Sequence, residues 1–183
     1  ENNRVTTMPR LGITYESMRK VRPDLIYLSM PAFGTTGPYA ESRGFGANTE
    51  AAVGFTWLRG YPDADPSMTY AIFHADAAAG ASAAFILSSA LHYRRRTGKG
   101  QFIDMSQGEN MIHHMSQAFM DYSMNLRSQE TIGNRSPTLT QGLYACVEPD
   151  TFVAIVVGTD SQWRSLVRVM GRPELEDNPC FAN

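Results

Sequence analysis

The residue with the clearest potential for chemistry is a single carboxylate, Asp76, in the stretch AIFHADAAAGASAAF over residues 71–85. An aspartate at the start of a helix is usually a cap, because its side-chain oxygen accepts one of the backbone N–H groups that the first turn leaves unpaired. A carboxylate can also act as a nucleophile toward a carbonyl carbon. The small residues after Asp76 would leave the first backbone N–H groups open to a ligand, where they could stabilise an oxyanion. From the residues alone, the roles of helix cap and of nucleophile are about equally well supported for Asp76.

Other patterns that resemble known sites predict no catalytic or metal centre. TGKGQ, at residues 97–101, lacks the spacing of a phosphate loop and precedes a strand, so it indicates a turn. GFGANTE, at residues 44–50, lacks the third glycine of a dinucleotide fingerprint. The adjacent His113 and His114 have no partner at ligand spacing, so no metal site is expected. No GxSxG context, the mark of a serine hydrolase, surrounds the serines at 29, 82 and 106.

Hydrophobic patterning predicts the elements that must position Asp76. Residues 14–21 read as a helix and residues 25–30 as a strand whose consecutive apolar residues are typical of a parallel sheet. A loop rich in glycine and proline follows this strand, where α/β proteins commonly bind ligands. Four further elements are expected before the chain becomes polar: helices at 45–53 and 77–96, a strand at 101–106 and a methionine-rich helix at 107–124.

A polar segment at residues 126–141, which contains the turn sequence GNRSP, predicts a linker between two domains. Beyond it, GLYACV and TFVAIVVG predict two strands, and DSQWRSLVRVMG predicts an amphipathic helix. The expected fold class is therefore α/β. Residues 1–125 would form part of an open parallel-sheet, nucleotide-fold-like large domain, and residues 142–183 the start of a small α+β domain.

The composition excludes several classes of function. The net charge of −2, with basic residues scattered outside one run of three arginines, predicts no nucleic-acid partner. Two cysteines, Cys146 and Cys180, form no CxxC pair, so neither a disulfide framework nor a zinc site is expected. The most apolar window is too short to cross a bilayer, and the residues that follow Glu1 do not form the apolar region of a signal peptide. These features favour a cytoplasmic protein with no membrane partner.

The residues around Asp76 resemble a known family, the class III coenzyme A transferases. The family includes formyl-CoA transferase and carnitine CoA-transferase, with α-methylacyl-CoA racemase as a relative. Three segments carry the resemblance: ENNRVTTMPRLG, LIYLSMPAFGTTGPY and ADAAAGASAAFILSSALHYRRRTGKGQFIDMS. The last is similar to the family pattern xDxxxGxxAAxxxxxALxxRxxTGxGQxxDxS, whose aspartate is the nucleophile. The resemblance therefore favours a nucleophilic role for Asp76.

The resemblance implies an acyl-CoA:carboxylate CoA-transferase. Asp76 would attack an acyl-CoA thioester to give a mixed anhydride, and the released CoA would convert it to an aspartyl-CoA thioester that an acceptor acid then uses. The partners would be an acyl-CoA and a small carboxylic acid, with coenzyme A as part of the substrate, no permanently bound cofactor and no metal. The family's CoA contacts carry over to eight residues: Asn2, Asn3, Arg4, Arg10, Arg43, Gly44, Phe45 and Gly46.

Departures from the family pattern narrow the expected function. Phe45 stands where the racemase relative has the histidine of its GHD sequence, which favours transfer over isomerisation. SPTLTQGLY replaces the glycine-run loop of formyl-CoA transferase, which argues against oxalate and formyl-CoA as substrates. The family's amino-terminal half, and the carboxyl-terminal segment that returns to the large domain, are not in this sequence. The chain is therefore expected to be a fragment of a protein that forms an interlocked homodimer. The alternatives are a non-catalytic CoA-binding or assembly fragment and, less favoured, an α-methylacyl-CoA racemase.

Overall fold

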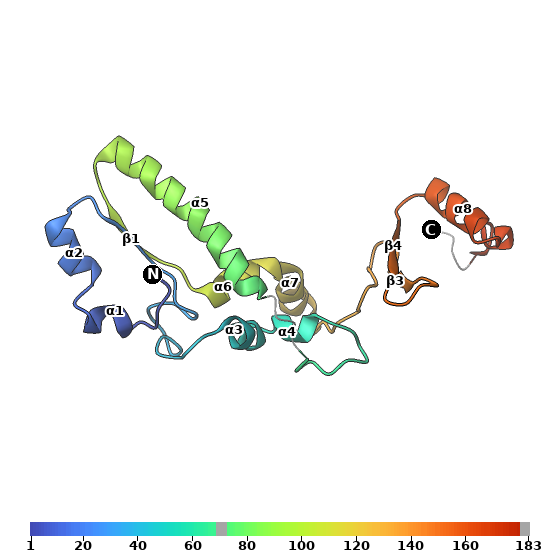
Figure 1. Cartoon of the computed structure of the whole chain (residues 1–183), viewed down its shortest axis with the longest axis horizontal. Helices are drawn as coiled ribbons and strands as arrows, with labels where there is room; N and C mark the ends of the chain where they lie inside the picture. The colour runs from blue at the N-terminus through green and yellow to red at the C-terminus, as the bar shows by residue number, and fades with distance from the viewer. Residues whose placement is uncertain (69–72, 180–183) are drawn as a thin grey trace. The chain divides into compact units, whose positions relative to one another are not determined.

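The computed structural model describes residues 1–68 and 73–179 of the chain. It divides into two compact units, Glu1–Thr131 and Ile132–Asn183 (Figure 1). Cys180, at which no disulfide was expected, lies outside the described residues, as do Ala71 and Ile72 of the stretch around Asp76.

The first unit contains a small parallel sheet. Strands β1 (Ile26–Ser29) and β2 (Gln101–Asp104) pair in register from Ile26 with Gln101 to Ser29 with Asp104. The mixed α/β architecture with a parallel sheet is therefore confirmed. Helix α2 (Tyr15–Val21) leads into β1 and is capped by Thr14, whose hydroxyl accepts a hydrogen bond from the Ser17 nitrogen at 3.1 Å.

Helix α5 (His74–Thr97) follows α3 (Gly46–Ala52) and α4 (Phe55–Leu58), leads into β2 and packs against the sheet (Figure 1). It begins three residues before the predicted start and ends at Gly98, whose positive φ of 71° suits a glycine after a helix. Its small residues allow close packing on both sides. Ala79 and Ala83 lie in a core with Leu28 and Met105, and other alanines of the helix contact the buried Met111.

Among the remaining helices of this unit, α3 and α6 (Gln107–His114) pack against α5. Helix α1 (Thr7–Arg10), which the sequence did not predict, lies near the amino terminus, and α3 and α4 follow the loop after β1. The single helix predicted at 107–124 is wrong: the chain forms α6 and α7 (Ser116–Asn125), separated at Met115.

The methionine stripe of this region is only partly in the core. Met111 and Met115 are buried, but Met120 and Met124 of α7 are exposed by 56% and 72%. The apolar side chains of α7 therefore do not add to the core of this unit.

The end of α7 is fixed by a buried carboxylate. Asp121 accepts hydrogen bonds from three side chains that follow it: Asn125, Arg127 and Gln129. These bonds hold the pKa of the Asp121 carboxyl well below its usual value, and the bond from Arg127 has the largest effect. The Thr131 hydroxyl donates to the Gly60 carbonyl oxygen at 2.6 Å. Residues 127–131, at the start of the predicted linker, are thus bound to the first unit.

The second unit is a hairpin followed by a helix. Strands β3 (Thr140–Ala145) and β4 (Phe152–Val157) are antiparallel, and helix α8 (Asp160–Val169) is capped by the Thr159 hydroxyl, which accepts from the Gln162 nitrogen. The two predicted strands and the amphipathic helix are confirmed. A short 3-10 turn, η1 (Pro173–Leu175), follows. Across residues 1–68 and 73–179, no helix is long and apolar enough to cross a membrane.

Candidate active site

Asp76 lies in the first turn of α5, three residues after the cap position. The helix begins at His74, and the cap position is occupied by Phe73, whose side chain offers no acceptor. The Asp76 side chain is exposed, and no hydrogen bond or ion pair to its carboxylate is found within the part of the chain that the structure describes. The carboxylate is therefore not used as a cap and is open to a ligand.

The surface around Asp76 is nearly bare. Ala77 and Gly80 follow it on the exposed side of α5, and a methyl group added at Gly80 would meet no atom within 4 Å. Gly80 is one helical turn after Asp76, so the two share a face of the helix. A substrate could therefore approach the carboxylate along this face without displacing a side chain.

On its other side, the Asp76 carboxylate lies against Gly46, the first residue of α3. A β-carbon built at Gly46 would lie 2.5 Å from Asp76 Oδ2 and 2.4 Å from Phe73 Cβ. Such distances are impossible for real atoms, so only glycine fits here without a shift of the neighbouring chain. The fold thus brings together two of the predicted site residues, Gly46 and Asp76, which are far apart in the sequence.

A buried carboxylate that no sequence pattern indicated lies beside this contact. Glu50 of α3 is fully buried, and its Oε1 accepts a hydrogen bond from the backbone nitrogen of Ala75 at 3.0 Å. Its Oε2 accepts from Arg59 Nη1 at 2.9 Å, which makes an ion pair. The pairing joins residues distant in sequence, so no short-range pattern signals it. A charged residue in the otherwise uncharged stretch GFGANTEAAVGF was the one available hint.

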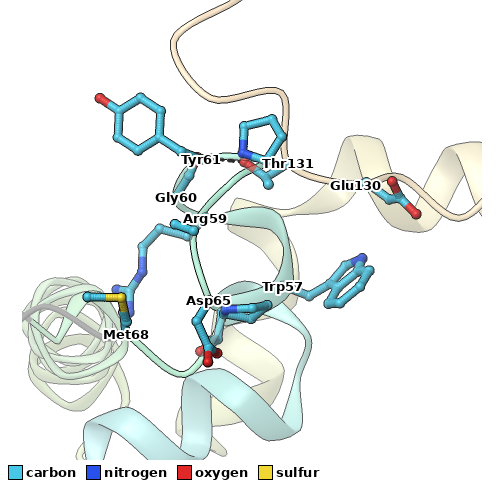
Figure 2. A pocket seen from close by; sticks show the side chains of 12 residues that line it. Trp57, Arg59, Gly60, Tyr61, Asp65, Met68, Glu130 and Thr131 are labelled. Carbon is cyan, nitrogen blue, oxygen red and sulfur yellow. Dashed lines mark hydrogen bonds between the residues drawn. The ribbon is translucent and has the colours of Figure 1, made fainter.

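Arg59 also borders a cavity with a volume of about 490 Å³ (Figure 2). Trp57, Tyr61 and Met68 line this cavity together with Arg59, and Asp76 is not among its lining residues. The guanidinium of Arg59 stacks on Phe55, with its central carbon 5.3 Å from the ring centre. Arg59 is therefore held between a cavity and the buried Glu50.

The second half of the family motif holds the loop that leaves β1. The Asp104 carboxylate accepts hydrogen bonds from the backbone nitrogen and the hydroxyl of Thr35. The Ser106 hydroxyl donates to the Ala32 carbonyl oxygen at 3.2 Å, and Gln107 Nε2 donates to that of Met30 at 2.9 Å. Asp104 and Ser106 of the motif, together with the following Gln107, thus fix the path of the loop that leads to α3.

The predicted CoA contacts fall in two segments that meet. Arg4 Nε donates to the Glu41 carbonyl oxygen at 3.0 Å, and its guanidinium lies 3.7 Å from the Glu41 carboxylate. This links the amino-terminal segment, which holds Asn2 and Asn3, to the loop that ends at Arg43. Arg10 lies in the last turn of α1 and is exposed.

Around α3, the predicted contacts differ in their exposure. The Arg43 side chain is exposed, and its carbonyl oxygen accepts a hydrogen bond from Asn48 Nδ2 at 3.0 Å. A β-carbon at Gly44 would lie 2.0 Å from that of Ala32, so this glycine is required for packing. Phe45 is 80% exposed beside the buried Gly46. Contact of these residues with coenzyme A stays a prediction.

Two histidines lie close to the site. His74 Nε2 and His114 Nδ1 are 3.5 Å apart, and the His74 ring stacks on Phe55. Over the described ranges, no group of three or more His, Cys, Asp or Glu side chains could hold a metal ion.

Comparison with known proteins gives consistent matches over the chain. A model of CoA-transferase family III matches residues 1–183. The acetyl-CoA:oxalate CoA-transferase of Acetobacter aceti is 34% identical over 99% of this chain and 46% of its own length. The succinyl-CoA–D-citramalate CoA-transferase of Chloroflexus aurantiacus is 33% identical over 100% of this chain and 45% of its own length.

A solved structure also matches. The chain is similar to a CAIB/BAIF family protein from Brucella suis with a TM-score of 0.86 and 33% identity, over 100% of this chain and 48% of that one. The chain thus spans about half the length of the relatives it matches.

Proposed function

The chain belongs to CoA-transferase family III, and on that premise we propose that the full-length protein transfers coenzyme A between an acyl-CoA and a carboxylic acid, with Asp76 as the nucleophile. The placement of Asp76 carries the proposal: its carboxylate is exposed, lies in the first turn of a long helix and rests on a glycine. A carboxylate that accepts no hydrogen bond from the protein keeps its lone pairs available for attack.

The proposed reaction has four covalent steps. An Asp76 oxygen attacks the thioester carbonyl, which forms a mixed anhydride and releases CoA thiolate. The thiolate attacks the aspartyl carbonyl, which gives an aspartyl-CoA thioester and frees the first acid. The acceptor carboxylate attacks that thioester, forming a second anhydride and again releasing the thiolate. The thiolate then attacks the new acyl carbonyl, which yields the product acyl-CoA and restores Asp76.

One feature favours transfer over isomerisation. Phe45 borders Gly46 and carries no proton that could be exchanged with a substrate carbon. The bare face of α5 next to Asp76 leaves room for the acyl group that transfer brings to the nucleophile. The proposal therefore assigns no acid–base role to Phe45.

The acceptor is proposed to be a dicarboxylic acid. The relatives from Acetobacter aceti and Chloroflexus aurantiacus are named for oxalate and D-citramalate, both of which carry two carboxylates. The replaced glycine-run loop argues against oxalate itself, so a panel of donors and acids on the full-length protein should include oxalate beside longer dicarboxylic and monocarboxylic acids. The acid with the highest kcat/KM identifies the acceptor.

Trapping of the intermediate tests the proposal directly. The full-length protein incubated with an acyl-CoA and then with hydroxylamine should carry a hydroxamate at Asp76, detected by peptide mass spectrometry. Omission of the acyl-CoA should leave Asp76 unmodified. Turnover that proceeds with Asp76 unlabelled would reject the assignment, and binding of CoA without transfer to any acid would favour a non-catalytic CoA-binding module.

For coenzyme A binding, we propose contacts from the two linked segments: Asn2, Asn3, Arg4, Arg10, Arg43, Gly44, Phe45 and Gly46. Arg10 and Arg43 are the strongest candidates for the phosphates. Both are exposed, and neither forms an ion pair within residues 1–68 and 73–179, whereas Arg4 is paired with Glu41. An arginine without a carboxylate partner can donate its hydrogen bonds to phosphate oxygens.

Arg43→Ala is expected to raise the KM for acyl-CoA by about 10-fold or more while kcat changes little, because one charge-assisted hydrogen bond is lost. The matched control is Arg95→Ala, an exposed arginine near the end of α5. With an acyl-pantetheine substrate, which lacks the nucleotide phosphates of coenzyme A, wild type and Arg43→Ala should have the same KM. An equal rise of KM for both substrates would contradict a phosphate contact.

A further inference from the structure

The start of α5 lacks a cap of its own. Phe73 occupies the cap position and has no acceptor group, so the first backbone N–H groups of the helix need partners from elsewhere. Glu50 supplies one of them, because its Oε1 accepts from the Ala75 nitrogen at 3.0 Å. A side chain of α3 thus does for α5 what a serine or aspartate at the cap position usually does.

This arrangement buries a charge completely. Glu50 has no exposed surface, and Arg59, whose side chain is 20% exposed, is its only ion-pair partner among the described residues. Arg59 Nη2 is itself buried without a hydrogen-bond partner. A buried ion pair contributes little to stability compared with apolar residues of similar size. Stability is therefore a weak reason for this pair to exist.

The positions of Gly46 and Glu50 on α3 suggest another reason. The two residues are one helical turn apart, so they share a face of α3. Gly46 lies against the Asp76 carboxylate, and Glu50 binds the nitrogen of Ala75, the residue before Asp76. One face of α3 therefore makes two contacts around the nucleophile: one with the Asp76 side chain and one with the backbone just before Asp76.

We propose that Glu50 is a positioning residue for Asp76. Glu50 acts through its Oε1, which accepts the hydrogen bond from the Ala75 N–H. This rests on the proposed function of Asp76. By fixing the first turn of α5, the hydrogen bond fixes the direction in which the Asp76 side chain leaves the helix. Arg59 compensates the charge of Glu50, so that no second uncompensated carboxylate lies beside the nucleophile.

Two double variants of the full-length protein separate the hydrogen bond from the charges. Glu50→Gln with Arg59→Gln removes both charges but keeps a carbonyl oxygen for the Ala75 N–H, and the two amides can bond to each other. Glu50→Met with Arg59→Met removes both charges and the acceptor. Apolar replacement of a whole buried ion pair is usually tolerated, so both variants are expected to fold.

The rate of Asp76 acylation in a single turnover is the deciding measurement. We expect acylation in the Met/Met variant to be about 10- to 100-fold slower than in the Gln/Gln variant, the size of effect that a misplaced reacting group produces. The KM for acyl-CoA should be the same in both. Hydrogen exchange of the Ala75 amide should be fast in the Met/Met variant and slow in the Gln/Gln variant.

Each outcome bears on one hypothesis. Equal acylation rates per folded molecule, with active wild type, would overturn the role of Glu50 and leave the proposed function intact. A difference confined to the unfolding temperature would do the same, because it would mean that Glu50 serves stability alone. Wild-type protein that transfers CoA from no donor would reject the proposed function, and the positioning role with it.

Discussion

Asp76→Asn is expected to lower kcat for CoA transfer by about 10⁴-fold or more, the effect of removing the nucleophile from a covalent mechanism. Asparagine has the shape of aspartate, but its amide cannot form the anhydride. The fold should be unaffected: the Asp76 side chain is exposed and accepts no hydrogen bond in the described part of the chain, so the free energy of unfolding should change by about 0.5 kcal/mol or less. Steady-state kinetics and thermal unfolding of the full-length variant check both expectations.

A matched control for this substitution is Asp160→Asn. Asp160 is an exposed aspartate in the first turn of α8, as Asp76 is in the first turn of α5. It lies outside the motif that carries the family resemblance, so its replacement should leave kcat unchanged. Asp76→Asn protein that keeps activity within about 10-fold of wild type would mean that the nucleophile is a different group.

The sheet and the helix that carries Asp76 could be predicted because their signals are local. Consecutive apolar residues before Ser29 indicated a buried parallel strand, and the arginines before Gly98 marked the end of α5. The start of α5 was placed too late because Phe73 is not a capping residue type. The partner that replaces the cap, Glu50, comes from another helix, which a local pattern cannot reveal.

The division between α6 and α7 had no signal of its own. Met115 interrupts the helix with φ at −118° although no proline or glycine is near it. The same methionine is buried, so the break is tied to tertiary packing and not to turn chemistry. Likewise, Asp76 could be singled out from its motif, but its contact with Gly46 depends on how α3 and α5 meet.

That contact makes Gly46 the second position where a small change should have a large effect. Gly46→Ala is expected to lower kcat by about 100-fold, because the added methyl group must displace the first turn of α5 and with it the nucleophile. The crowded atom, Phe73 Cβ, is attached directly to the backbone and cannot swing away as the end of a flexible side chain could. Overpacking should also cost about 1–3 kcal/mol of stability, which the better helix propensity of alanine offsets only in part.

Gly80→Ala is the control that isolates the crowding. It adds the same methyl group to α5 one turn after Asp76, where no atom lies within 4 Å of the new carbon. This variant should gain up to about 1 kcal/mol of stability from helix propensity, so it serves as a control for stability. Thermal unfolding should show a lower unfolding temperature for Gly46→Ala and one near or above wild type for Gly80→Ala, and kcat should fall in Gly46→Ala. Full activity in Gly46→Ala would show that the nucleophile does not depend on close contact between α3 and α5, because the carboxylate would then work equally well when pushed away from α3.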